Sequence, residues 1–172
     1  TNPGTELRDA LTIAATKRAA QITALGNEFI PVGKVIGEKA IINGIIGLLA
    51  TGGSTNHTLH IVAIARAAGI ELRWEDMDEL GQIIPLLARV YPNGSADVNQ
   101  FHAAGGLGYV IGQLRNQGLL HDDVNTVVGH GMAAYTQEPY LNNGTIAWRD
   151  GVTAPLDETI IRPINNPFAI DG

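Results

Sequence analysis

A glycine-rich stretch carries the residues of this sequence that are best suited to contact a ligand. It reads TGGSTN over positions 51–56 and lies between two apolar stretches. Gly52 and Gly53 would let a ligand approach the main chain, because they have no side chain. Ser54, Thr55 and Asn56 add hydroxyl and amide groups that form hydrogen bonds. We call residues 52–56 the elbow.

A helix is expected to begin in the elbow, since Ser54 or Thr55 can cap it. Free N–H groups at a helix N-terminus attract anions, so a carboxylate or phosphate group would be stabilised there without a metal or a cationic side chain. A capped turn with a purely structural role is the alternative, because such helix starts are common. The stretch matches neither the dinucleotide fingerprint nor the Walker A motif.

Other residues that could take part in chemistry form weaker patterns. His57 and His60 lie three positions apart and could be joined by His102, but no acidic residue completes a zinc-protease motif. Capping, hydrogen bonding or ligand contact by His57 are alternatives to metal binding. Ser54 lies outside a G-x-S-x-G setting, which leaves a hydrolase triad unsupported. Four carboxylates are typical of a solvated helix face: Glu75, Asp76, Asp78 and Glu79.

The spacing of apolar residues and turn signals predicts a helix-rich chain. Helices are expected at residues 5–25, 38–50, 54–69, 74–80 and 98–118, the last capped by Asp97 and interrupted by Gly105 and Gly106. Residues 83–90 are expected to be extended, because Pro85 fits neither a central helix nor a central strand. Short strands are expected at residues 126–128 and 160–163.

Composition excludes several classes of protein. The 172 residues are 45% hydrophobic, which suits one domain with a core. The net charge of −6 argues against nucleic acid as a partner. Residues 40–50 form an apolar stretch that is shorter than the roughly 20 residues a membrane-spanning helix needs. With no cysteine, the chain cannot form a disulfide or supply a thiolate to a metal.

Three separated motifs carry a resemblance to a known family. They are ATGGSTNHTLH at 50–60, ADVNQFHAAGG at 96–106, and QEPY at 137–140 followed by WRDG at 148–151. Together they resemble the dihydroxy-acid and phosphogluconate dehydratases. The NHTLH sequence at 56–60, the YPNG turn at 91–94 and the WR pair at 148–149 are similar to the phosphogluconate branch rather than the branched-chain amino-acid branch.

The resemblance implies an α/β, helix-rich fold. It covers the chain from about Thr5 onward but corresponds only to an interior portion of family members. Residues 1–160 would belong to the N-terminal α/β domain, and residues 161–172 would begin the connection to a C-terminal β-rich domain. The chain opens at Thr1 without an initiator Met and stops at Gly172, which also leads us to expect a segment of a longer protein.

The activity that the resemblance implies is that of a hydro-lyase. The full-length enzyme would dehydrate 6-phospho-D-gluconate to 2-dehydro-3-deoxy-6-phosphogluconate in the Entner–Doudoroff route of gluconate metabolism. A base would take the C2 proton, and a Lewis acid would draw off the C3 hydroxyl. The resemblance also implies a cytoplasmic homodimer with an iron–sulfur cluster, of the 4Fe–4S type, and magnesium. Neither cofactor is expected to be held by these residues, and we assign no catalytic residue among them.

The elbow would then form part of the wall that faces the substrate. The residues expected to meet oxygens of the phosphorylated sugar acid are Gly53, Ser54, Thr55, Asn56 and His57. Two alternatives remain open at this point. One is another dehydratase of the family, acting on dihydroxy acids or unphosphorylated sugar acids. The other is a non-catalytic anion-binding module.

Overall fold

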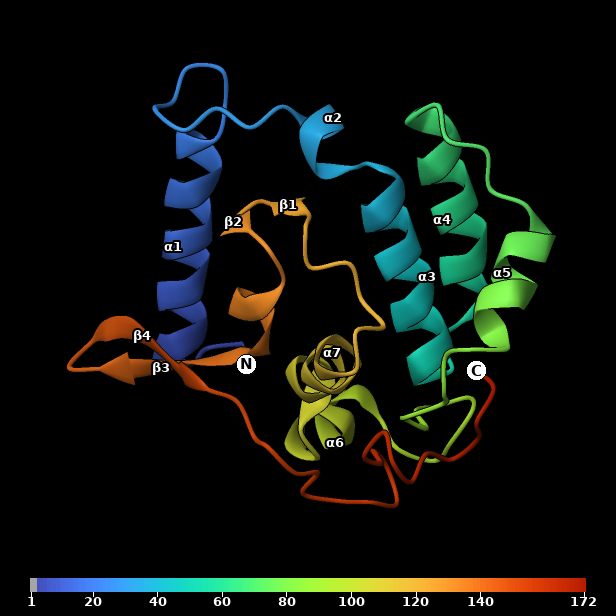
Figure 1. The fold of residues 1–172 in the computed structure, drawn as a ribbon. Helices are drawn as coiled ribbons and strands as arrows, with labels where there is room; N and C mark the ends of the chain where they lie inside the picture. Colours follow the sequence, from blue (N-terminus) through green and yellow to red (C-terminus); the bar gives the residue numbers. More distant parts are fainter. Residues whose placement is uncertain (1–2) are drawn as a thin grey trace.

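The computed structural model describes residues 3–172, in which most helices precede the strands along the chain (Figure 1). The helices are α1 (Glu6–Gln21), α2 (Val32–Val35), α3 (Glu38–Thr51), α4 (Thr55–Ala67), α5 (Trp74–Gly81), α6 (Val98–Ala103), α7 (Gly106–Asn116) and the 3₁₀-helix η1 (Ala133–Thr136). The strands form two antiparallel pairs, β1 (Asn125–Thr126) with β2 (Gly129–His130) and β3 (Gln137–Asn142) with β4 (Thr145–Asp150). This confirms the helix-rich fold.

Helix α3 lies between two apolar clusters, as its nearly continuous apolar sequence requires. One side packs against α4 and α5 through Ile41, Ile45, Ile61, Ala65 and Met77. The other side joins α7 and the extended segments through Ile46, Ala50, Leu87, Val110, Leu114 and Ile161. Gly44 brings α3 close to α4, because a Cβ at this position would stand 3.0 Å from Cδ1 of Ile61.

The sequence predicted an extended segment at 83–90, and residues 84–90 are extended, whereas Ile83 still belongs to the turn after α5. The segment crosses the end of α3. The N–H groups of Leu87 and Ala88 both donate to the carbonyl oxygen of Ala50, at 2.7 and 3.1 Å. That carbonyl lies in the last turn of α3, where it lacks a helical partner. Two consecutive buried residues of this segment therefore obtain their main-chain hydrogen bonds from the helix end.

The C-terminal residues run beside the same segment. Single bridges pair Ala88 with Ile161 and Leu86 with Ala169. The strand expected at residues 160–163 is wrong, since only Ile161 forms a bridge there and Pro163 has no N–H with which to continue one. The end of the chain returns to α5, where the N–H of Gly172 donates to the carbonyl oxygen of Gly81 (Figure 1).

Two other local expectations differ from the structure. The strand expected at 126–128 is displaced, because Thr126 already pairs with Gly129 and the valines between them form the turn. The first helix ends at Gln21 rather than Leu25, where the chain folds back and Glu28 N–H bonds the carbonyl oxygen of Gln21. No residue of α1 is buried.

The region around α6 and α7 follows the sequence closely. The carboxylate of Asp97 accepts hydrogen bonds from the N–H groups of Asn99 and Gln100 at 2.9 and 2.8 Å, and so caps α6. The predicted interruption falls between the two helices, where Gly105 and Gly106 have φ of +134° and +63°. Such backbone angles favour glycine.

The loop after α7 is fixed by one carboxylate. Asp122 Oδ2 accepts hydrogen bonds from Arg115 Nε and Nη2 at 3.0 and 2.8 Å, and Asp122 Oδ1 accepts one from the N–H of Met132 at 2.7 Å. The bonds from Arg115 and then from Met132 lower the pKa of Asp122 to about 2. Hydrogen bonds to the charged form have this effect.

Replacing Gly52 with alanine is expected to destabilise the chain. Gly52 ends α3 with φ of +56°, and an added Cβ would stand 2.0 Å from Nδ2 of Asn93. We expect Gly52→Ala to lower the free energy of unfolding by about 1–3 kcal/mol. Gly47→Ala is the control, because Gly47 lies inside α3 and an added Cβ there would have no atom within 4 Å. This change should raise the free energy of unfolding by about 0.5–1 kcal/mol. Urea unfolding followed by circular dichroism measures both, and equal effects would contradict the role of Gly52.

Acid should weaken the fold through Asp122. Its pKa of about 2 lies below the ordinary value of about 3.9 expected in the unfolded chain. The carboxylate therefore stabilises the fold above pH ~4, and this contribution disappears as the pH falls from ~4 through ~2. Asp122→Asn should be less stable than wild type at pH 7 and should lose less stability over that acid range. Unfolding measured at several pH values tests this, and parallel curves for the two proteins would contradict it.

Candidate functional site

The first half of the elbow serves to end α3. The N–H of Gly52 donates to Leu49 O at 3.2 Å, and the N–H of Gly53 donates to Leu48 O at 2.9 Å. These bonds satisfy carbonyl groups that a helix end leaves unpaired. Gly53 is nevertheless exposed, so it can offer a ligand close approach to the main chain but not its N–H group.

The second half of the elbow begins α4. Ser54 is the N-cap residue, with extended φ and ψ of −81° and 155°, but its side chain makes no capping hydrogen bond. Thr55 and Asn56 are the first two helical residues, whose N–H groups have no acceptor within a helix. The third, His57, donates its N–H to Ser54 O at 2.9 Å. The elbow therefore presents an open N-terminus of a 13-residue helix.

The predicted site residues share one exposed location. The residues that we expect to meet the substrate are all exposed: Gly53, Ser54, Thr55, Asn56 and His57. They are consecutive, so the fold needs no long-range contact to bring them together. The fold places the end of α3 and the start of α4 beside a turn from another part of the chain (Figure 1).

That turn contains Asn93, which sequence reasoning did not place beside the elbow. It is closed by hydrogen bonds from Tyr91 N–H to Ala96 O at 2.8 Å and from Gly94 N–H to Val90 O at 3.1 Å. The side-chain amide of Asn93 lies against the Cα of Gly52. Any residue with a Cβ at position 52 would leave no room for this amide. The YPNG motif predicted the turn, but it did not predict that Asn93 contacts Gly52.

A polar cavity of about 370 Å³ is lined in part by this turn. Its lining includes one cation, Arg89, and one carboxylate, Asp157. The remaining polar side chains come from Asn93, Ser95, Gln100 and Thr159. Because Asn93 contacts Gly52 and also lines the cavity, the elbow and the polar cavity are neighbours.

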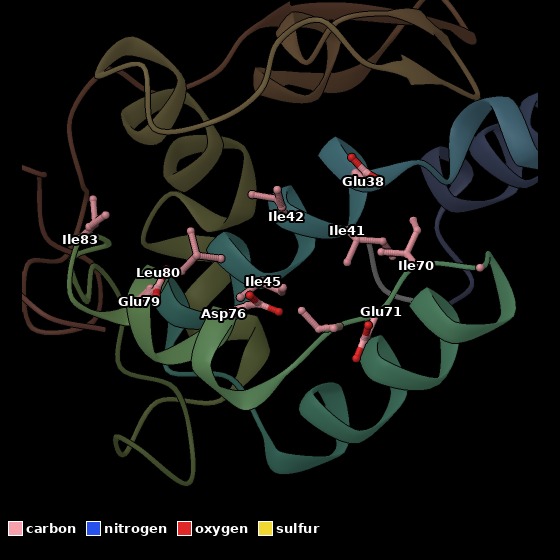
Figure 2. Close-up of a pocket in the computed structure, with 12 residues that line it drawn as sticks. Glu38, Ile41, Ile42, Ile45, Ile70, Glu71, Asp76, Glu79, Leu80 and Ile83 are labelled. Atoms are coloured by element: carbon pink, nitrogen blue, oxygen red, sulfur yellow. The ribbon is translucent and has the colours of Figure 1, made fainter.

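A second, larger space has the opposite chemistry. This groove of about 570 Å³ is floored by isoleucine and leucine side chains, and Figure 2 shows Ile41, Ile42 and Ile45 of α3 within it. Four carboxylates line it, and no Lys or Arg does: Glu38, Glu71, Asp76 and Glu79. Such a groove repels an anionic metabolite. Of the acidic residues that the sequence placed on a solvated helix face, Asp76 and Glu79 thus line a groove.

The histidines do not assemble into a metal site. Within residues 3–172, no three His, Asp or Glu side chains lie close enough together to hold a metal ion. His57 and His60 are exposed on α4, whereas His102 is exposed on α6. The side chains of this part of the chain therefore offer no group of three such ligands to a metal ion, and without cysteine they cannot hold an iron–sulfur cluster through thiolates, so no reaction step is assigned through either. None of its helices has the length and apolar character needed to cross a bilayer.

Comparison with known proteins gives two kinds of match. The family model for the N-terminal part of dihydroxy-acid/6-phosphogluconate dehydratases matches residues 1–135. The phosphogluconate dehydratase of Rhizobium meliloti is 58% identical over 172 residues, and that of Pseudomonas aeruginosa is 53% identical over 171. Each of these alignments covers 99% of this chain.

The relatives differ in similarity and are much longer than this chain. The dihydroxy-acid dehydratase of Rippkaea orientalis is 33% identical over 155 residues, which cover 88% of this chain and 25% of that protein. The chain spans 28% of the length of the phosphogluconate dehydratases named above. The three motifs, the helix-rich fold and the match over residues 1–135 together show that the chain belongs to the dihydroxy-acid/6-phosphogluconate dehydratase family.

Proposed function

We propose that these residues belong to a hydro-lyase that dehydrates 6-phospho-D-gluconate to 2-dehydro-3-deoxy-6-phosphogluconate. The observation that carries this proposal is the difference in identity between the two kinds of relative. Proteins named phosphogluconate dehydratase are 47–58% identical over nearly the whole chain, whereas the dihydroxy-acid dehydratase is 33% identical. The reaction places the enzyme in the Entner–Doudoroff route of gluconate metabolism in the cytoplasm.

The chemistry of this reaction sets the role of the chain. Dehydration requires removal of the C2 proton and departure of the C3 hydroxyl, which need a base and a Lewis acid. We assign neither role to the residues of this chain. In the proposal the whole enzyme is a homodimer with an iron–sulfur cluster and magnesium, and residues 161–172 lead into its next domain. The part played by this chain is to hold and orient an anionic substrate.

We propose the elbow as one place where the substrate is held. The exposed N–H groups of Thr55 and Asn56 stand at the positive end of α4. The hydroxyl of Ser54 is not used for capping, so it remains available to a ligand. Gly53 permits close approach, and the side chain of His57 lies on the first turn of the same helix. A carboxylate oxygen of the sugar acid is the ligand that this arrangement favours.

Substrate preference tests the proposed reaction. The whole enzyme that contains this chain should dehydrate 6-phosphogluconate with a kcat/KM at least about 100-fold higher than for gluconate or for a branched 2,3-dihydroxy acid, because a built polar site discriminates strongly against a ligand that lacks the matching group. Formation of the 2-keto acid product measures each rate. A preference for either competitor would replace the proposal with another dehydratase of the family. No turnover of any substrate, with phosphate still bound, would favour the anion-binding module.

A charge placed at Ser54 tests the elbow. Ser54→Asp keeps a good N-cap residue but puts a carboxylate where the substrate anion would bind. We expect its KM for 6-phosphogluconate to rise on the order of tenfold, with the unfolding temperature unchanged or higher. Ser54→Asn is the matched control, because asparagine caps equally well without charge. If both variants keep the wild-type KM, the elbow does not bind substrate.

A further inference from the structure

Two arginines far apart in sequence are stacked on one aromatic ring. The guanidinium carbons of Arg89 and Arg162 lie 4.7 and 4.3 Å from the centroid of the Phe168 ring. Within residues 3–172, neither arginine forms an ion pair with a carboxylate. Cation–π contact with the ring does not neutralise either charge, and Arg162 Nε also donates to the carbonyl oxygen of Glu158 at 3.4 Å. An anion bound beside them would supply the missing counter-charge.

The backbone beneath this cluster is firmly fixed. Arg89 N–H donates to Ile160 O at 2.9 Å, and Arg162 N–H donates to Leu87 O at 2.8 Å. These bonds flank the bridge between residues 88 and 161, where both side chains are fully buried. Phe168 is held in turn by a hydrogen bond from its N–H to Leu86 O at 2.9 Å. The three side chains therefore project from paired segments and not from a free loop.

Arg89 also lines the polar cavity, whose lining includes Asn93, the residue that contacts Gly52 of the elbow. Gln100 uses its Oε1 to accept from Asp97 N–H at 2.8 Å, which leaves its amide hydrogens available as donors. Ser95 supplies a hydroxyl from the opposite wall. The single carboxylate, Asp157, is already bonded by Thr159 through its N–H and hydroxyl at 2.9 and 2.6 Å. The groups left to meet a ligand are mostly donors.

We infer that this cavity, with Arg89, Ser95 and Gln100 in its lining, binds the phosphate group of a phosphate monoester, and that Arg162, which shares the Phe168 ring with Arg89 but lies outside the lining, adds positive charge nearby. Guanidinium groups match phosphate oxygens in geometry and charge. The inference rests on the proposed function, because 6-phosphogluconate carries a carboxylate at one end and a phosphate at the other. The elbow and the cavity are two separate sites of the kind that such a molecule needs, and Asn93 lies between them. The cavity is thus the specificity site for the phosphorylated end.

Kinetics of the whole enzyme test this site. Arg89→Gln should raise the KM for 6-phosphogluconate on the order of tenfold or more, because it loses a charge-assisted hydrogen bond. Arg162→Gln should raise it less, because it removes only a neighbouring positive charge. The inhibition constant of inorganic phosphate should rise in parallel, while inhibition by gluconate stays at the wild-type value. Arg66→Gln is the matched control, since Arg66 is an exposed arginine at the far end of α4. It should change none of these values.

Two further measurements distinguish loss of the phosphate site from unfolding of a variant and from failure of the proposed function. Ser95→Asp leaves both arginines in place and adds a charge to the cavity, so it should weaken phosphate binding even if the arginine variants unfold. Calorimetric titration of the wild-type enzyme with inorganic phosphate reports binding whether or not dehydration occurs. If 6-phosphogluconate is dehydrated but the variants raise KM equally for phosphorylated and unphosphorylated substrates, the cavity is not the phosphate site and the proposed function stands. If 6-phosphogluconate is not dehydrated, the proposed function fails, and loss of phosphate binding in Ser95→Asp would still support the cavity.

Discussion

The hydrogen bonds of the buried extended segment 84–90 hold both proposed binding places in position. A buried main chain must find partners for its N–H and C=O groups. Here the carbonyl of Ala50 accepts two N–H groups, and the C-terminal residues supply most of the others. The same segment leads into the turn with Asn93 and carries Arg89. The end of α3, the elbow, the turn and the arginine cluster therefore depend on one set of main-chain contacts.

Charge is distributed unevenly over this acidic chain. A net charge of −6 disfavours long-range attraction of anions, but salt screens such effects beyond roughly 8–10 Å. Local groups then decide what binds. Donors gather at the start of α4 and around Arg89, whereas four carboxylates gather at the apolar groove between α3 and α5 (Figure 2). The acidic groove and the polar cavity share no lining residue.

Local sequence predicted most elements because their signals are local. Asp97 caps α6 through bonds to residues two and three positions away, and Gly52 and Gly118, with φ of +56° and +70°, follow the ends of α3 and α7. The strand predictions were wrong where the pairing partner of a residue decides its structure. Val127 and Val128 have high strand propensity but form a turn, because Thr126 pairs with Gly129 across them. Ile161 reads as part of a strand, yet only one residue of the neighbouring segment bridges it.

The sequence alone determined the longer helices, the extended segment at Pro85, the family resemblance and the elbow, whose candidate residues are consecutive. Each of these depends on residue type and short spacing. Tertiary structure decided that Asn93 lies on Gly52, that Arg89 and Arg162 share the ring of Phe168, and that two acidic residues of α5 face an isoleucine floor. These contacts join residues 40 or more positions apart or different elements, and only the folding of the chain brings such groups together.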